Sequence, residues 1–159
     1  IFGIKYINEY HGNYLLRGKT LAWKDDSEIM GEPTTYGYGK YGYVEEGIVT
    51  PLLTRSLSSL EYSQQIQVSE GTSPGLYTVI LTVHPETGDV TVAPKEGSPF
   101  GIRGTGKYVK GGQEWGGKKR NALYLNLTIT DRTNRYEVQD TLVFRDNTVK
   151  TEEFTPVIL

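Results

Sequence analysis

Polar and apolar residues alternate along several stretches of the chain, most clearly between positions 123 and 129. Aliphatic residues occupy the odd positions there, and Tyr124, Asn126 and Thr128 lie between them. This period of two is the pattern of a strand that is buried on one face. Residues 77–83 repeat it, and no stretch shows a convincing helical period. The alternation therefore predicts an all-β protein.

Turn-forming clusters mark where the strands end. EGTSPG at 70–75 and HPETGD at 84–89 are rich in residues that favour turns. Between such clusters the sequence predicts roughly eight strands, the number in an eight-stranded barrel. Their approximate ranges are 11–25, 47–53 and 55–68 with a break near Pro51, 77–83, 90–92, 100–110, 122–130 and 136–145.

The first strand changes phase along its length. Tyr14 and Leu16 are inward candidates at even positions, whereas Leu21 and Trp23 are apolar at odd ones. A bulge near Gly18 would reconcile the two halves and place Trp23 in the core.

Three connections are predicted from their composition. Residues 131–135 join the last two strands as a hairpin turn. Residues 111–119 form a Gly-rich loop with Trp115 at its centre, and the Tyr-Gly run at 36–44 is irregular or an edge strand.

Sequential strands at short spacing are typical of an antiparallel up-and-down meander. We expect it to close as a lipocalin-like barrel of roughly eight strands, which removes exposed strand edges. A two-layer β-sandwich is the alternative. The 159 residues suit one domain: residues 1–10 are interpreted as an incoming strand or linker from an upstream domain, and residues 11–159 as a single β-barrel domain.

Charge and composition exclude several function classes. The chain has 17 basic and 19 acidic residues mixed along its length, which argues against nucleic acid or an anionic membrane as partner. It has no cysteine, so disulfides and thiolate metal sites are excluded. No apolar run approaches the roughly 18 residues of a membrane helix, and we expect no transmembrane segment and no cofactor.

No catalytic constellation emerges from the spacing of titratable residues. The only histidines are His11 and His84, and neither has a nucleophile or carboxylate at useful spacing. Glu45 and Glu46 lack a partner for glycosidase chemistry. Asp140 interrupts an apolar strand face, so it is either a bulge residue or an inward-facing carboxylate. We therefore predict a protein that is not an enzyme.

Trp115 is the first binding candidate, because it lies between two glycine pairs. A large ring on a flexible loop can stack on the apolar face of a sugar or clamp a small ligand. Gln113, Glu114, Lys118 and Lys119 would give such a ligand polar orientation. Alternatively, the indole folds back as a plug over one barrel end, since exposed Trp is uncommon.

The tyrosine run is the second binding candidate. Tyr36, Tyr38, Tyr41 and Tyr43 would project alternate rings and could line a carbohydrate groove if the run is extended. The alternative is a mobile or edge-packed loop.

Three phrases of the sequence carry a family resemblance. They are FGIKYINEYHGNYLLRGK at 2–19, GTGKYVKGGQEWGGKKRNALYLNLTITD at 104–131 and YEVQDTLVFRDNTVKTEEFTPV at 136–157. The chain resembles the C-terminal domains of uncharacterised Bacteroidetes surface lipoproteins, which are associated with starch-utilisation-type glycan uptake systems.

The resemblance implies a lipocalin-like, or calycin-like, barrel outside the cytoplasm. It would lie at the outer-membrane surface or in the periplasm, anchored by an upstream segment. The implied function is non-catalytic binding of a glycan or glycoprotein. A structural domain that docks on its own upstream domain or on an uptake complex is the alternative, and a glycoside hydrolase accessory or a lipophilic-ligand carrier is less favoured.

Overall fold

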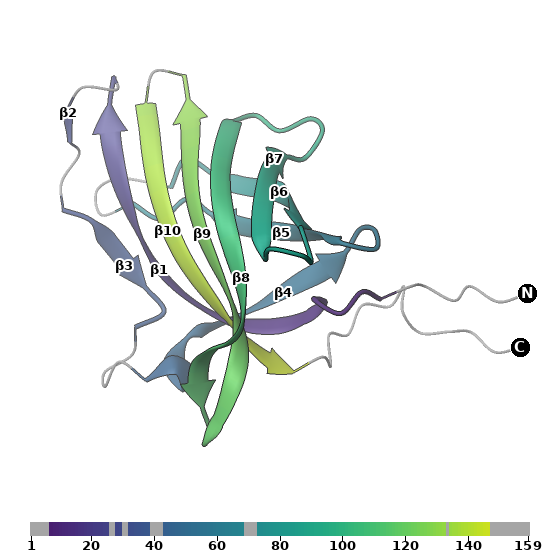
Figure 1. Cartoon of the computed structure of the whole chain (residues 1–159). Helices are drawn as coiled ribbons and strands as arrows, with labels where there is room; N and C mark the ends of the chain where they lie inside the picture. Colours follow the sequence, from purple (N-terminus) through teal and green to yellow (C-terminus); the bar gives the residue numbers. More distant parts are fainter. Residues whose placement is uncertain are drawn as a thin grey trace, which may run out of the picture.

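The computed structural model describes residues 7–25, 28–29, 32–38, 43–68, 73–132 and 134–146. Within these ranges the chain forms ten strands and one short 3-10 turn, η1 (Val44–Glu46) (Figure 1). The strands are β1 (Gly12–Lys24), β2 (Glu28–Ile29), β3 (Thr34–Tyr36), β4 (Ile48–Thr54), β5 (Ser59–Gln65), β6 (Leu76–Val83), β7 (Asp89–Pro94), β8 (Gly101–Trp115), β9 (Lys118–Asp131) and β10 (Asn134–Asp146).

Eight strands close into an antiparallel β-barrel, which confirms the predicted fold. The strands follow the order β10-β9-β8-β7-β6-β5-β4-β1, and β1 then pairs with β10. The short strands β2 and β3 pair with β1 outside this circuit. In the described part of the chain no helix has the length and apolar character needed to cross a membrane.

The pairing of β1 with β10 closes the barrel. It runs in continuous register from Trp23 opposite Arg135 to Tyr14 opposite Phe144, and the register shifts only between Asn13 and Tyr14. The predicted bulge near Gly18 is therefore wrong.

Trp23 lies outside the barrel, so its prediction as a core residue is also wrong. Because β1 keeps one phase, its even positions face inward, and the small side chains of Thr20 and Ala22 are the buried ones. Leu21 and Trp23 occupy the outer face and are half-buried. The guanidinium of Arg135 stacks 4.6 Å from the Trp23 ring centre, which is how the outer wall accommodates a large apolar ring.

Pro51 lies within β4, although a break was predicted there. At Pro51 the strand pairs with β1, while β4 pairs with β5 only at Leu53 and Thr54. A proline is tolerated where a strand has a partner on one side only. The actual connection between β4 and β5 is the turn at 55–58.

Residues 111–119 form the tip of a long hairpin instead of the predicted loop. Gly116 and Gly117 both have positive φ, 62° and 74°, and they make the two-residue turn between Trp115 and Lys118. Turns of this kind need left-handed conformations at both positions, which glycine adopts without strain. The other glycine pair lies at a register shift between Val109 and Gln113, where a bulge strengthens the twist. Figure 1 shows this hairpin extending past the rest of the barrel.

Side chains from all eight barrel strands fill the interior. The largest that are fully buried are Tyr14, Tyr62, Tyr77, Leu16, Leu52, Leu60, Ile66, Leu81, Leu123, Leu125, Ile129 and Leu142. At one end the chain before β1 joins this core: Tyr10 packs edge-on against Tyr108 with ring centres 4.8 Å apart, and the Asn8 amide donates to the carbonyl of Ser59.

Two inward-facing glycines, Gly104 and Gly106, let neighbouring strands approach β8 closely. A Cβ atom at Gly104 would lie 2.3 Å from the backbone oxygen of Asn126 and 2.9 Å from Leu127 Cδ2. Such contacts force the backbone to move, which costs roughly 1–3 kcal/mol in a packed core.

We therefore expect Gly104→Ala to lower the free energy of unfolding, measured by urea titration, by roughly 1–3 kcal/mol. Gly101→Ala, on the same strand as Gly104, is the control, because its Cβ would meet only Thr130 Cβ of β9, at an ordinary contact distance of 3.8 Å. Equal stability of the two variants would contradict the close packing of β8 on β9.

Candidate functional site

Trp115 is held against the protein at the hairpin tip. Its indole N–H donates to the backbone carbonyl of Phe144 at 2.9 Å, and the Arg120 guanidinium lies 4.2 Å from its ring centre. The side chain is half-buried and is not among the residues that pack the barrel core. One face of the indole is thus occupied by a cation, so that face is closed to stacking on a ligand.

The polar neighbours of Trp115 do not converge on a common point. The Gln113 amide donates to the Tyr124 hydroxyl at 2.8 Å. Glu114, Lys118 and Lys119 are exposed along the two strands of the hairpin. The predicted binding residues are therefore close in sequence, and none of them lines the three hollows of the barrel surface that are lined by residues 25, 76–78, 95–105, 126–132 and 135–139.

The tyrosine run divides into residues with different surroundings. Tyr38 and Tyr43 are 52% and 60% exposed, and the Arg17 guanidinium lies 5.5 Å from the Tyr38 ring centre. Tyr36 points into the barrel, where its hydroxyl donates to Asp140. Tyr41 lies outside the described residues. The structure thus does not bring Tyr36 and Tyr38 to one exposed face.

Asp140 is an inward-facing carboxylate in the barrel interior, and the bulge interpretation is wrong. It is 3% exposed, and the register of β10 with β1 and with β9 is unbroken before and after Asp140. Its carboxylate accepts hydrogen bonds from the hydroxyls of Tyr36 and Tyr62, the second at 2.8 Å. Gly18 lies opposite on β1, where a Cβ would come within 2.4 Å of the carboxylate, so the glycine makes room for it.

Burial sets the protonation of this cluster. Loss of solvation raises the pKa of the Asp140 carboxyl to about 6, although the hydrogen bonds from Tyr36 and Tyr62 act in the opposite direction. The same desolvation, together with the nearby carboxylate, raises the pKa values of Tyr36 and Tyr62. The cluster is therefore a set of hydrogen-bonded groups enclosed by protein, which orders β3 on the barrel.

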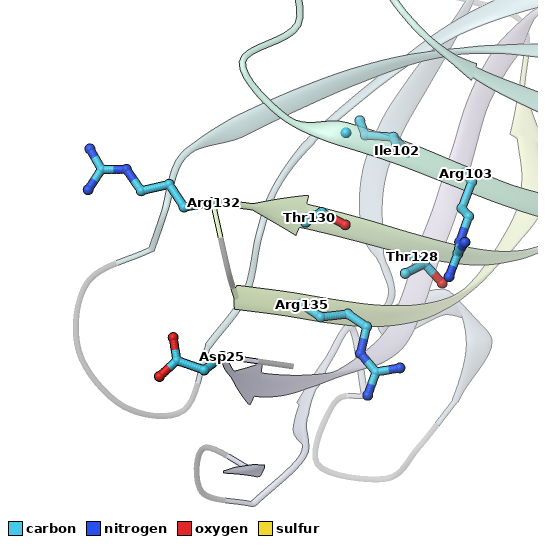
Figure 2. Close-up of a pocket in the computed structure, with 8 residues that line it drawn as sticks. Asp25, Ile102, Arg103, Thr128, Thr130, Arg132 and Arg135 are labelled. Atoms are coloured by element: carbon cyan, nitrogen blue, oxygen red, sulfur yellow. The ribbon is translucent and has the colours of Figure 1, made fainter. Parts of the chain in front are cut away.

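A well-defined hollow lies elsewhere, across the outer face of the sheet where β8 begins and β9 ends. It has a volume of about 550 Å³ and is lined by mostly polar residues from four segments: Asp25, Gly101, Ile102, Arg103, Thr128, Thr130, Arg132 and Arg135. Figure 2 shows Arg103 beside Thr128, whereas Arg132 extends away from the strands at the β9–β10 turn. We take this outer hollow as the candidate functional site.

Hydroxyl, guanidinium and carboxylate groups make the outer hollow a hydrogen-bonding surface. Arg103 is exposed opposite Thr128, and Arg135 lies opposite Thr130. Arg135 also contacts Glu137 at 3.3 Å. Guanidinium groups donate in a planar fork that suits carboxylates, sulfates and adjacent hydroxyls. In the described ranges no group of three or more His, Cys, Asp or Glu is placed to hold a metal ion.

The sequence analysis missed this hollow, although part of it was within reach. The alternation at 123–129 already places Thr128 on the outer face of its strand. The predicted turn at 131–135 would put Thr130 opposite Tyr136, whereas Asp131 pairs with Asn134, so Thr130 faces Arg135 and Thr128 faces Glu137. The contribution of Arg103 and Asp25 could not be found in this way, because it depends on how β8 and the end of β1 meet that hairpin.

Comparisons with known proteins place the chain among proteins of unknown function. A family model described as "Domain of unknown function (DUF5627)" matches residues 9–148. A crystal structure of a Bacteroides ovatus protein, described as structural genomics, unknown function, is 29% identical with a TM-score of 0.74. The match covers 93% of this chain and 45% of that one, so this chain spans less than half of the longer protein. A search of curated proteins finds no match.

The Asp140 cluster predicts a pH dependence of stability. Between pH 4 and 6 the unfolded chain has lost the Asp140 proton while the folded protein keeps it, because the folded pKa is about 6 and the ordinary value is 3.8. The contribution of this group to the free energy of unfolding is therefore greatest below pH 4 and is lost as the pH rises through 6. The difference of about two pKa units amounts to roughly 3 kcal/mol.

We expect Asp140→Asn to abolish this decline, measured as the difference in unfolding free energy between pH 4 and 7.5. Glu86→Gln, in the exposed turn between β6 and β7, removes a carboxyl without touching the cluster and should keep the decline. The same pH dependence in wild type and Asp140→Asn would show that the carboxyl is not the responsible group.

Proposed function

Because the chain belongs to the DUF5627 family, to which no activity is attached, we propose its function from the chemistry of its surface. We propose that it is a non-catalytic binding domain, and that it binds a glycan in the outer hollow. The observation that carries this proposal is the hollow of about 550 Å³ lined by Arg103, Arg135, Thr128 and Thr130.

A polar, open hollow suits a polyhydroxylated ligand. The threonine hydroxyls can both donate and accept hydrogen bonds, while the guanidinium groups only donate. Adjacent hydroxyls of a sugar ring offer the complementary donors and acceptors. Because Arg135 and Thr128 are partly buried in the sheet face, their positions are largely set before a ligand arrives, which lowers the entropic cost of binding.

The packed interior supports surface binding over a carrier function. Carriers of lipophilic molecules need an apolar cavity inside the barrel. Here Tyr14, Tyr62 and Tyr77 cross the interior together with leucines from most strands. An apolar ligand would have to displace this core.

Binding without catalysis agrees with the surroundings of the titratable groups. Asp140 is enclosed with tyrosines, and His11 is buried, with its Nδ1 accepting from the Thr54 amide at 3.0 Å. His84 is exposed in the turn that joins β6 to β7. Neither histidine lines the outer hollow. A location outside the cytoplasm, on a surface lipoprotein of a glycan uptake system, belongs to the same proposal and is supported by the sequence resemblance.

A second candidate function, docking on another domain or partner, is supported by exposed apolar residues. Ile48 and Val49 at the start of β4 are 41% and 51% exposed. The matched Bacteroides ovatus chain is more than twice as long as the aligned part. In this alternative the exposed side chains of β4 pack against another domain or a partner protein, and the domain binds no sugar.

The glycan proposal predicts the effect of removing hydroxyls. We expect Thr128→Val/Thr130→Val to weaken binding of oligosaccharides about thirtyfold, from two lost hydrogen bonds of about 1 kcal/mol each, as measured by calorimetry. Valine keeps the shape and strand preference of threonine, so the fold should persist. Thr82→Val, on the outer face of β6, is the matched control.

The variant Trp115→Ala distinguishes the outer hollow from the hairpin tip. It should bind like wild type, because Trp115 is engaged with Arg120 and Phe144. Loss of binding in Trp115→Ala with normal binding in the threonine variant would show that the glycan binds at the hairpin tip and not in the outer hollow. No oligosaccharide binding by wild type would refute the glycan proposal and favour docking.

A further inference from the structure

Basic residues are concentrated on one side of the barrel. The registers of β8, β9, β10 and β1 align their outward side chains in rows that cross all four strands. We call this surface the basic wall. Its rows are Gly101–Thr130–Arg135–Trp23, Arg103–Thr128–Glu137–Leu21, Thr105–Asn126–Gln139–Lys19 and Lys107–Tyr124–Thr141–Arg17.

The basic wall is positive although the whole chain is negative. Its rows hold five basic residues and one acidic residue, Glu137, which contacts Arg135 at 3.3 Å. At the edge of the wall, Lys107 forms an ion pair with Asp89 on β7 at 3.0 Å. The whole chain has 17 basic and 19 acidic residues, which leaves 12 and 18 for the rest. Charges that are mixed along the sequence are therefore separated in space, and the wall attracts anions.

The wall also continues the outer hollow. A second hollow of about 530 Å³ shares Arg103 and Thr128 with it and extends over Thr105, Asn126 and Gln139. The two hollows follow the strands, so together they are long enough for a chain-like ligand. Arg103 on β8 and Lys19 on β1 lie three strand spacings apart, which is roughly 14 Å across the sheet at about 4.8 Å per strand. Charges spaced in this way match a ligand that carries several anionic groups.

We infer that the basic wall binds an extended acidic oligosaccharide, one that carries carboxylate or sulfate groups along its length. This inference rests on the proposed glycan binding and names the class of glycan. Arg103 and Lys19 attract the acidic groups, and Thr105, Asn126 and Gln139 hydrogen-bond the hydroxyls between them.

The side chains of the wall favour an acidic glycan over a single-stranded nucleic acid. Binding of single strands relies on aromatic side chains on which bases stack. Two aromatic rings lie in the described rows. Trp23 is covered by the Arg135 guanidinium, and the Tyr124 hydroxyl accepts from Gln113. Two rings, one of which is covered on one face, do not form the series of stacking platforms that successive bases need.

The test compares oligosaccharides of matched length and different charge. Oligogalacturonate supplies carboxylates, a heparin oligosaccharide supplies sulfates, and a dextran oligomer is the neutral probe. Calorimetry with wild type at low and physiological salt should give binding of an acidic probe that weakens as salt rises. Dextran should bind at least tenfold more weakly.

The variant Lys19→Gln/Arg103→Gln removes two charges from the wall. Its affinity for the acidic probe should fall at least tenfold. The control Arg55→Gln/Lys95→Gln removes two charges that contact Glu61 on β5, outside the wall, and should keep wild-type affinity within about twofold. Thermal unfolding establishes that both variants are folded.

The outcomes separate the two proposals. If dextran binds as tightly as the acidic probes and the wall variant binds normally, glycan binding stands and the inference about acidic groups is wrong. If none of the three probes binds, the proposed function itself fails. If a single-stranded DNA oligonucleotide binds as tightly as the acidic probes and loses affinity in the same variant, the glycan is the wrong class of ligand.

Discussion

The antiparallel pairing of β1 with β10 is the contact on which the rest of the structure depends. It joins strands from the two ends of the described chain and turns an open meander into a closed barrel. Closure leaves no long unpaired edge on either strand. It also fixes which side chains are enclosed: once Tyr14 lies opposite Phe144, every second residue of both strands points to the interior. The basic wall and the place of Asp140 both follow from this register.

The fold could largely be predicted from the sequence because strand alternation is a local signal. The all-β class, the barrel and the hairpin between β9 and β10 followed from residues close together in the chain. The errors arose where distant residues decide. A tryptophan beside Leu21 is typical of a core strand, but Trp23 lies on the outer face, where Arg135 of another strand covers its ring. The Gly-rich segment resembled a loop because glycine fits both a flexible loop and a tight turn with positive φ.

The candidate site was harder to predict, because its parts come from four segments. Trp115 and the tyrosines are large rings of the kind that binding sites use, yet Tyr36 hydrogen-bonds Asp140 in the barrel interior. Trp115 hydrogen-bonds the Phe144 carbonyl and stacks with Arg120. The side chains that line the hollow are threonines and arginines, which are common on any strand. Their arrangement is visible only when the register is known, as is the separation of positive from negative charge. Spatial charge patterning of this kind is invisible in a net charge of -2.

The inward glycines of β8 have a consequence for how this barrel could change over evolution. Ligand cavities in barrels usually arise when large inward side chains are replaced by small ones. At Gly104 and Gly106 there is no side chain left to shorten, and the space is already occupied by Leu125, Leu127 and Val90. New interior volume can therefore arise only from the leucines and tyrosines of the other strands, whose loss costs core stability. Exchange of polar residues on the outer face changes binding specificity at a smaller loss of folding stability.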